Sequence, residues 1–396
     1  FKAGVFVSSE RKELILSNGL VKRTFGITPD VACTGYENLT TGLQMIRAIN
    51  PEAIVTIDRI EYPIGSLNGP KERGYLKKKW MGDFTAFNGE FRLNDINISG
   101  IKPYVEWKPG RWCSNPNLPT GKTVSFIYKA IDSGRLKDVQ IVVKYEIYDG
   151  IPLINKWVEV FNEGDKAVMI NKVVSESLAL VEEESAVVGK PEEMLKPSYL
   201  YIETNYAFNN AMNYRVSDQT THWKRDYDYT SQVNYNYDTP CVLEIYPHTD
   251  PDMRLHPGEK FRSPHSFELS LDGYDRERNG LAVRKMYRTV TPWVTENPIF
   301  MHLVSRTDDQ VFTAIDQCAE TGYEALILSF GSHINIEDTS DVNVERMKAF
   351  ADYAHEKNIL FFNFRAYVIL LIDQGTQIYE AIHTFKFICS NLNVLR

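Results

Sequence analysis

The side chains best suited to chemistry gather in one aromatic segment, residues 199–237, where tyrosines and a tryptophan alternate with amide, guanidinium and carboxylate groups. Flat aromatic rings stack on the apolar faces of sugar rings, while amides, Arg and carboxylates hydrogen-bond sugar hydroxyls. The segment therefore predicts a carbohydrate-facing rim. Its candidate substrate-binding residues are Tyr206, Asn213, Tyr214, Arg215 and Trp223. The alternative is that these tyrosines only pack a large β domain and its loops.

Within this segment, Trp223 is the stacking partner most worth testing, because indole has the broadest aromatic face. Its neighbours His222 and Lys224 predict an exposed polar loop. An exposed contact residue that is truncated to alanine loses ligand affinity and little folding stability. The sequence therefore predicts that behaviour for Trp223→Ala.

A second group of polar side chains, Ser332, Asn335 and Glu337, follows an apolar strand predicted over residues 324–330. Loops at the carboxyl ends of parallel strands form the binding sites of β/α barrels, so these three side chains could bind hydroxyl groups. The alternative is an ordinary connecting loop in which residues 338–341 cap the next helix. The sequence leaves both interpretations open.

Four residues in a short stretch have the types that ligate metals: His248, Asp250, Asp252 and His256. Pro247, Pro251 and the Pro-Gly pair at 257–258 indicate turns there, so solvated loop residues are favoured and no metal site is expected. The five cysteines form no CxxC pair. Neither a glycine-rich phosphate loop nor a GxSxG motif occurs. No cofactor is expected.

The elements that would position these residues change type along the chain. Residues 12–271 form short β-rich runs separated by turn residues, including a hairpin with an Asn18-Gly19 turn and strands over 139–148, 154–162 and 169–180. So many strands predict a large antiparallel β-supersandwich of two sheets. Its predicted inward positions are Leu14, Leu16, Val143, Tyr145, Trp157, Val160 and Phe161.

From residue 299 the pattern becomes a β/α alternation. Strands are predicted over 299–304, 324–330 and 359–364, and helices over 308–321 and 341–357. A capping box at 307–310 and Gly322 mark the ends of the first helix. A closed (β/α)8 barrel needs roughly 250 residues, so residues 299–396 match only an incomplete barrel segment. Residues 366–372 and 377–388 suit one further strand and helix.

The predicted domains are therefore a β-supersandwich over residues 1–291, which ends in a linker helix over 275–288, and a partial β/α barrel segment over 292–396. The tail 365–396 is atypical. Pro292 is expected to end the linker helix.

Composition limits the partners. The chain has 396 residues, of which 43% are hydrophobic, and a net charge of −8. A negative field repels polyphosphate, which argues against nucleic acid or an anionic membrane surface. The longest apolar run, 366–372, is too short to span a membrane. A first residue other than Met is compatible with a processed chain, so a periplasmic or secreted location is left open, as is a homo-oligomer.

Several separated blocks resemble a known family. Residues 18–25 (NGLVKRTF), 230–237 (TSQVNYNY), 276–278 (RER) and 286–288 (MYR) are similar to the galactose mutarotase-like N-terminal supersandwich of bacterial α-galactosidase-like proteins of glycoside hydrolase family 36. Residues 322–332 (GYEALILSFGS) resemble the second barrel strand of that group. The resemblance covers most of residues 12–364.

The resemblance implies a plan: an N-terminal β-sandwich, a catalytic barrel and a small C-terminal β domain. In that plan the nucleophilic Asp lies at the end of the fourth barrel strand and the acid/base Asp near the sixth, both beyond the recognisable part of this chain. Many relatives also hold galactose with two Asp residues after the second strand, where this chain has Ser329-Phe330-Gly331. No catalytic residue is therefore assigned, although retaining glycosidases need two carboxylates.

The sequence accordingly predicts a carbohydrate-active protein that resembles the N-terminal part of an α-galactosidase-type hydrolase, lacks the catalytic carboxylates, and binds an oligosaccharide or glycoside. Two alternatives stay open. One is an active glycosidase whose barrel is completed by a second chain. The other is a non-enzymatic sugar-binding or assembly domain.

Overall fold

The computed structural model describes residues 1–8, 12–103, 117–131, 134–183, 196–206, 220–229, 241–292, 299–329, 331–335 and 338–363. The chain divides into two compact units. One, the sandwich unit, comprises Phe1–Ile101 and Pro119–Met286, and the other, the β/α unit, comprises Lys102–Leu118 and Tyr287–Arg396. The sequence places the boundary at residues 291–292 and does not indicate that 102–118 belongs with the second unit.

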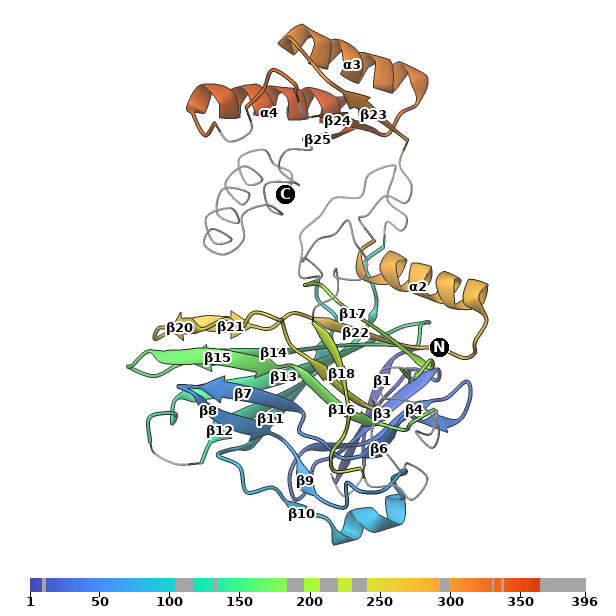
Figure 1. The fold of residues 1–396 in the computed structure, drawn as a ribbon, viewed down its shortest axis with the longest axis vertical. Helices are drawn as coiled ribbons and strands as arrows, with labels where there is room; N and C mark the ends of the chain where they lie inside the picture. Colours follow the sequence, from blue (N-terminus) through green and yellow to red (C-terminus); the bar gives the residue numbers. More distant parts are fainter. Residues whose placement is uncertain are drawn as a thin grey trace. The chain divides into compact units, whose positions relative to one another are not determined.

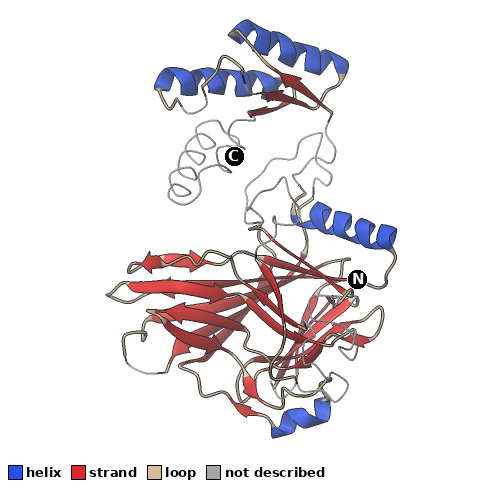
Figure 2. Cartoon of the chain, viewed as in Figure 1, coloured by secondary structure: helices blue, strands red, loops and turns tan. Residues whose placement is uncertain are grey.

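Antiparallel strands dominate the sandwich unit (Figure 2). Its largest sheet has the order β11-β12-β13-β14-β22-β17, with β21 paired to β14. These strands are β11 (Phe91–Gly100), β12 (Gly121–Ala130), β13 (Val139–Tyr148), β14 (Leu153–Asn162), β17 (Leu200–Thr204), β21 (Lys260–Arg262) and β22 (Ser266–Ser270).

Smaller sheets complete this unit (Figure 1). The first has the order β1 (Gly4–Val7), β2 (Glu13–Ser17), β3 (Val21–Gly26), β4 (Ala32–Asn38) and β5 (Leu43–Gln44). The second has the order β20 (Met253–Leu255), β15 (Val168–Val174), β7 (Ala53–Ile57) and β8 (Ile60–Ile64). The third has the order β18 (Thr221–Lys224), β19 (Val242–Ile245), β16 (Glu176–Leu180) and β6 (Ile46–Ala48). The short strands β9 (Leu67–Asn68) and β10 (Thr85–Ala86) form a pair on either side of the 3-10 helix η1 (Lys78–Asp83).

The predicted first hairpin is confirmed. Strands β2 and β3 pair antiparallel from Glu13↔Gly26 to Ser17↔Lys22. Gly19 supplies the positive φ of +82° that the turn requires, a conformation that a side chain would strain. The Asn18 amide donates to the carbonyl oxygens of Tyr148 and Ile151, both at 2.7 Å, which fixes the turn against strand β13. Local turn chemistry and a distant strand therefore specify the same register.

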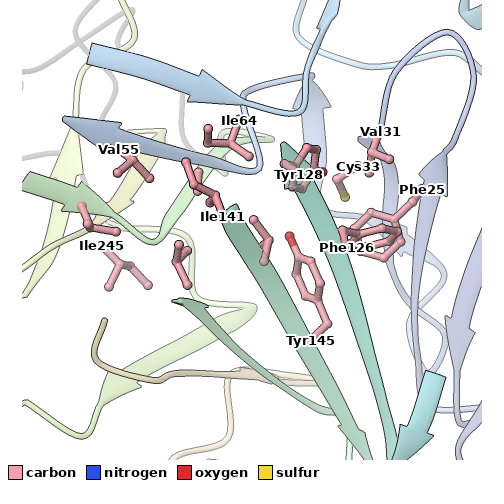
Figure 3. Packing of buried hydrophobic residues seen from close by; sticks show 14 of the residues in the cluster. Phe25, Val31, Cys33, Val55, Ile64, Phe126, Tyr128, Ile141, Tyr145 and Ile245 are labelled. Atoms are coloured by element: carbon pink, nitrogen blue, oxygen red, sulfur yellow. The ribbon is translucent and has the colours of Figure 1, made fainter. Parts of the chain in front are cut away.

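The main apolar core of the sandwich unit lies between the large sheet and the smaller ones (Figure 3). The ring centroid of Phe25 lies 4.9 Å from those of Phe126 and Tyr145. Five of the predicted inward side chains lie in this core: Leu14, Leu16, Val143, Tyr145 and Val160.

Trp157 and Phe161 are corrections to that prediction. Strand β14 directs Val158 and Val160 into the core, so by alternation Trp157 and Phe161 lie on the other face of the sheet. Trp157 is nevertheless buried, because it stacks on His265 with the ring centroids 4.3 Å apart.

The β/α unit follows the predicted order closely. Helix α2 (Arg276–Val290) crosses the boundary between the two units. The β/α unit contains strands β23 (Phe300–Leu303), β24 (Ala325–Leu328) and β25 (Leu360–Asn363) and helices α3 (Asp308–Thr321) and α4 (Asp341–Glu356). The three strands form a parallel sheet in the order β23-β24-β25. Thr307 caps α3 by accepting from the Gln310 amide, and Gly322 ends it at φ 82°. The strand and helix predicted over 366–372 and 377–388 lie outside the described residues.

An apolar core of its own holds this unit together. Val311 and Ile315 of α3, Phe350 of α4, and Leu326 and Leu328 of β24 are all buried in it. No helix in the described ranges is long and apolar enough to cross a membrane.

Candidate functional site

The residues that the sequence singles out fall in both units of the chain. Tyr206 and Trp223 lie in the sandwich unit, and Ser332 and Asn335 lie in the β/α unit. Asn213, Tyr214, Arg215 and Glu337 lie outside the described residues.

Trp223 does not lie in an exposed loop, so that prediction is wrong. It is part of strand β18, opposite Leu243 of β19, and it packs against the main core of the sandwich unit. The Lys196 ammonium lies 5.9 Å from its ring centroid. His222 and Lys224 predicted exposure because they are polar, but alternation along a strand places them on the face opposite to Trp223.

Tyr206, by contrast, lines a pocket of about 350 Å³ in the sandwich unit. The Tyr206 side chain lies at its edge and is 37% exposed. The pocket combines two aromatic rings, apolar walls, a guanidinium, an amide and hydroxyls. Its lining residues are Val173, Asn205, Tyr206, Pro247, Thr249, Pro251, Phe261, Arg262, Ser263 and Pro264. We call this hollow the Tyr206 pocket.

Contacts with neighbouring strands hold the Tyr206 pocket in shape. Asn205 and His265 exchange two hydrogen bonds: the His265 amide donates to Asn205 Oδ1 at 2.8 Å, and the Asn205 amide donates to the His265 carbonyl at 3.2 Å. The Ser263 hydroxyl accepts from the Val158 amide at 2.9 Å. Three prolines fix φ along the remaining wall. The walls are therefore preformed.

Arg262 is the charged group of the pocket, and its direction is fixed by a buried carboxylate. Its Nε lies 3.0 Å from Glu159 Oε1, while its side chain is 43% exposed. Glu159 is 1% exposed and also pairs with Lys144 at 2.9 Å. Burial by itself would raise the pKa of Glu159, but the hydrogen bond and charge of Lys144 hold that pKa below its usual value. Glu159 therefore stays ionised and orients the guanidinium.

His265 lies behind the pocket and is neutral at physiological pH. Burial, followed by the positive charge of Arg262, lowers the pKa of His265 to about 3. Its Nδ1 lies 3.2 Å from the Asn155 side-chain amide, and its ring stacks on Trp157. The imidazole thus acts as a packed polar support and not as a proton donor.

A larger and more open hollow, of about 750 Å³, lies beside Asp58, Asp250 and Asp252. Two of its three carboxylates are already engaged: Asp58 accepts from the Met169 amide at 3.1 Å and Asp252 accepts from Asn171 at 2.8 Å. Within the described ranges no group of three or more His, Cys, Asp and Glu side chains could hold a metal ion. Because its lining includes no aromatic ring, this hollow is the weaker candidate for sugar binding.

The carboxyl ends of β23 and β24 carry the second predicted group. The Ser332 hydroxyl accepts from the Ser305 amide at 3.2 Å and donates to the Leu303 carbonyl at 3.4 Å, so it ties the two strand ends together. Asn335 is exposed, and its backbone carbonyl accepts from the Asn343 side chain at 2.8 Å. Ser332 therefore has a structural contact, while Asn335 faces solvent.

A hydrogen-bonded chain of Ser305, His333 and Asp308 adjoins these residues and was not predicted. Ser305 Oγ lies 3.1 Å from His333 Nδ1, and His333 Nε2 lies 2.7 Å from Asp308 Oδ1. Asp308 Oδ2 also lies 3.3 Å from Arg346 Nε. The order resembles that of a nucleophilic serine triad, but Ser305 is 0% exposed, so no substrate can reach its hydroxyl.

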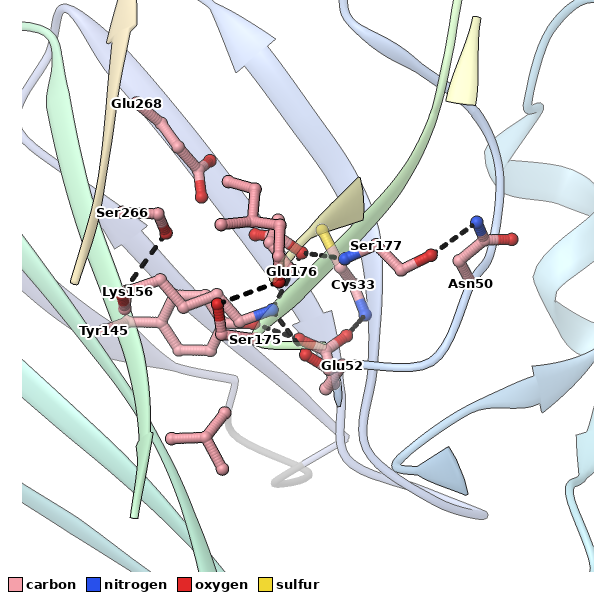
Figure 4. Close-up of polar contacts among 12 residues, drawn as sticks. Cys33, Asn50, Glu52, Tyr145, Lys156, Ser175, Glu176, Ser177, Ser266 and Glu268 are labelled. Carbon is pink, nitrogen blue, oxygen red and sulfur yellow. Dashed lines mark hydrogen bonds and ion pairs between the residues drawn. The ribbon is translucent and has the colours of Figure 1, made fainter. Parts of the chain in front are cut away.

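A buried ionic cluster in the core of the sandwich unit was not predicted from the sequence; Figure 4 shows three of its members, Lys156, Glu176 and Glu268. Arg23 of β3 pairs with Glu176 of β16 at 3.0 Å and with Glu268 of β22 at 3.1 Å. Lys156 of β14 pairs with Glu176 at 2.8 Å and donates to the Glu52 carbonyl at 2.5 Å. Three sheets are therefore joined through four ionisable side chains, those of Arg23, Lys156, Glu176 and Glu268. We call this group the ionic cluster.

The two acids that contact Arg23 have opposite pKa shifts. Burial and the nearby negative charge of Glu176 raise the pKa of Glu268 to about 8. Burial would also raise the pKa of Glu176, but Arg23 and Lys156 outweigh it and lower that pKa to about 2. Such a split is typical of acid/base pairs in enzymes. Here both side chains are 0% exposed, so the ionic cluster joins the sheets and cannot act on a substrate.

No protein-family model and no curated protein matches this chain. Among solved structures, it is similar to the galactosidase domain of an alpha-galactosidase-sucrose kinase (TM-score 0.47, 10% identity) and to the alpha-galactosidase from Lactobacillus brevis (0.48, 11%). It is also similar to a family 36 alpha-galactosidase from Geobacillus stearothermophilus (0.44, 12%). Family 36 enzymes are thus found, as the sequence resemblance predicts.

These matches cover 98%, 98% and 91% of this chain, but only 65%, 63% and 56% of the three solved chains, in the same order. The chain therefore spans less than two thirds of the length of each.

Proposed function

We propose that this chain is a carbohydrate-binding protein of the family 36 type, and that its sandwich unit holds an oligosaccharide in the Tyr206 pocket. The observation that carries the proposal is the composition of that pocket: aromatic and apolar walls with a few fixed polar groups. A sugar has the same dual character, with apolar ring faces and a rim of hydroxyls.

The size and order of the pocket support this ligand class. Ligand pockets usually fall between about 300 and 1,000 Å³, and this one has about 350 Å³. Tyr206 offers an accessible ring for stacking, and Arg262, oriented by Glu159, offers donors to hydroxyl oxygens. Because these groups are already positioned, little side-chain entropy is lost on binding.

We further propose that the β/α unit is the opening part of a (β/α)8-type barrel, and that the described strand ends do not hydrolyse glycosides. Retaining glycosidases need two carboxyl groups about 5–5.5 Å apart. The acids described nearest to these strand ends are both engaged: Asp308 pairs with His333 and Arg346, and Asp338 accepts from the Ser340 amide at 2.9 Å. Neither is placed to act as a nucleophile.

One observation favours the alternative of a glycosidase completed by a second chain. On the sheet face opposite to helices α3 and α4, Phe300 and Phe362 are 49% and 47% exposed. Exposed large apolar side chains grouped on one sheet face are typical of a surface that another element covers. Activity that appears only when a second polypeptide is added would support this alternative.

Calorimetric titration tests the main proposal. Raffinose and stachyose are suitable probes, because Geobacillus stearothermophilus family 36 enzymes have been solved in complex with them. We expect binding by the full chain and a loss of roughly 1–3 kcal/mol for Tyr206→Ala. Tyr274→Ala is the matched control, because Tyr274 is 79% exposed and outside the pocket lining. Equal binding by both variants would contradict the proposal. The same chain should not hydrolyse aryl α-galactosides.

A further inference from the structure

An exposed basic loop, residues 71–83 (KERGYLKKKWMGD), contributes no residue to the lining of the Tyr206 pocket. It contains five cationic residues, Lys71, Arg73, Lys77, Lys78 and Lys79, and two acids, Glu72 and Asp83. Its net charge is therefore 5 − 2 = +3, within a chain whose net charge is −8. We call this segment the basic loop.

The buried guanidinium of Arg47 holds the beginning of the basic loop through hydrogen bonds. Arg47 is 0% exposed and donates from Nη1 to the carbonyl oxygens of Lys71 at 2.6 Å and Arg73 at 3.4 Å. The Arg47 guanidinium lies 4.2 Å from the ring centroid of Tyr229. A Cβ at Gly74 would lie 2.9 Å from Tyr229 Oη, so a larger residue there would require the Tyr229 side chain to shift. These contacts fix the backbone conformation at the beginning of the basic loop.

The second half of the basic loop is anchored by apolar side chains. Leu76, Trp80 and Met81 pack against a small buried cluster formed by Ala32, Ile49, Leu67 and Phe84. Trp80 is part of the 3-10 helix η1, which also carries Lys78 and Lys79. The backbone beneath the lysines is therefore folded and packed.

Contacts with aromatic rings further restrict the positions of the cationic side chains of the basic loop. Tyr75 and Trp80 stack with their centroids 5.4 Å apart at 27°. The Arg73 guanidinium lies 4.3 Å from the Trp80 ring centroid, and the Lys77 ammonium lies 4.9 Å from that of Tyr75. Cation–π contacts of this kind restrict where the charges point. Long cationic side chains that are already ordered lose less entropy when they bind an anion.

These charges remain accessible. The Lys78 side chain is 84% exposed, that of Arg73 is 47% exposed and that of Lys71 is 41% exposed. Their acidic neighbours are at 3.5–3.8 Å: Glu13 beside Lys78, Glu72 beside Arg73 and Asp228 beside Lys71. Exposed pairs at such distances are weak and are replaced easily by a stronger anion.

We propose that the basic loop binds an anionic polysaccharide, whose sugar units carry carboxylate or sulfate groups. Several cations in a fixed arrangement match a polymer that repeats its negative charge, and lysines also hydrogen-bond sugar hydroxyls. The choice of a carbohydrate over other polyanions rests on the proposed function.

The aromatic contacts of the basic loop argue against nucleic acid as the ligand. Single-stranded nucleic acid binds through bases stacked on open aromatic faces. Here the face of Trp80 is covered by Arg73 and its ring is stacked on Tyr75.

The test measures binding of polygalacturonate and dextran sulfate to the full chain, with neutral dextran and a single-stranded DNA oligonucleotide beside them. The variant is Lys77→Gln/Lys78→Gln/Lys79→Gln. The matched control, Lys129→Gln/Lys137→Gln/Lys166→Gln, makes the same change of charge at exposed positions elsewhere in the sandwich unit. Thermal midpoints of both variants verify folding.

We expect at least one anionic glycan to bind, with an affinity that falls as salt rises. The loop variant should bind it roughly tenfold more weakly and the control variant within about twofold of wild type. Equal losses in both variants, no binding of either anionic glycan, or tighter binding of DNA would overturn the proposal. Binding of raffinose and stachyose should be unchanged in the loop variant, so failure here is distinguishable from failure of the Tyr206 pocket.

Discussion

In the sandwich unit, Arg23, Lys156 and Glu176 form ion pairs whose side chains are at most 1% exposed. In the β/α unit, the ion pair of Asp308 with Arg346 joins side chains that are 43% and 38% exposed. The nitrogen–oxygen distances differ little: they are 2.8–3.1 Å in the ionic cluster and 3.3 Å in the Asp308–Arg346 pair. Water screens the Asp308–Arg346 pair and is excluded from the ionic cluster. Loss of one partner therefore leaves a desolvated charge only in the sandwich unit.

The difference also concerns what the charges connect. The ionic cluster joins strands β3, β14, β16 and β22, which belong to three sheets. The core of the β/α unit consists of apolar residues, and its ion pairs join partly exposed side chains. We infer that the ionic cluster fixes how the sheets of the sandwich unit face one another, whereas the ion pairs of the β/α unit contribute little to its stability.

The largest effect is expected for Arg23→Met. This change leaves Glu176 and Glu268 buried without their shared cation, which should cost about 3–5 kcal/mol of the free energy of unfolding. The matched change in the other unit is Arg346→Met, for which about 0–1 kcal/mol is expected. Urea unfolding of both variants measures the difference between the two losses in free energy of unfolding. Similar losses would remove the distinction between the two units.

The pH dependence of stability sharpens the same comparison. The folded-state pKa of Glu268 is raised from 4.5 to about 8, so its stabilising contribution is complete below pH 4.5 and is lost as pH rises through about 8. The pKa of Glu176 is lowered to about 2, so its contribution is present above pH 4.5 and is lost as pH falls through about 2.

Glu268→Gln isolates the first of these effects, because glutamine imitates the protonated acid and cannot ionise. We expect wild type to lose stability between pH 5 and 9 and the variant to lose markedly less. Urea midpoints across this range provide the measurement. If the two profiles coincide, Glu268 is not protonated in the folded protein.

A smaller loss of folding stability is expected for Trp223→Ala. The sequence predicts the reverse for this variant, a loss of ligand affinity with little loss of stability. Trp223 packs against the core from strand β18, so truncation should cost about 2–4 kcal/mol of folding stability. Its affinity for raffinose and stachyose should stay within about twofold of wild type. A selective loss of sugar binding with unchanged unfolding would restore the original interpretation.

The smallest effect is expected at the strand ends. Asp308→Asn removes the charge that faces His333 and Arg346 but keeps the side-chain shape. Because Asp308 is 43% exposed, we expect a loss of about 0.5 kcal/mol or less at low salt, and none at about 1 M salt. Thermal unfolding at both salt concentrations measures this. A loss that persists at high salt would mean that the contact is desolvated.

Short-range signals in the sequence predicted local structure well. The bounds of α3 agree with the prediction because Thr307 and Gly322 mark its two ends through their own backbone and side-chain chemistry. The first hairpin was predicted for the same reason, since Asn18-Gly19 favours a tight turn. In both cases the determining interactions lie within a few residues.

Long-range features were predicted less well. Trp157 and Trp223 were misplaced because only the partner strand decides which face of a strand is covered. Arg23 and Lys156 did leave a signal: each occupies an inward position, between Val21 and Phe25 and between Ile154 and Val158. A charge at such a position indicates a buried partner, although its identity depends on the fold. The Tyr206 pocket combines residues 173, 205, 247 and 261, which alternation cannot bring together.

The most direct test of the central claim is hydrogen–deuterium exchange of the full chain with and without stachyose, because it distinguishes the two candidate regions in one measurement. If the sandwich unit binds the sugar, amides at 204–206 and 261–263 should exchange more slowly in its presence. Amides at 303–308 and 331–335 should be unchanged. Protection confined to the strand ends of the β/α unit, or protection at neither region, would contradict the proposal that the Tyr206 pocket binds carbohydrate.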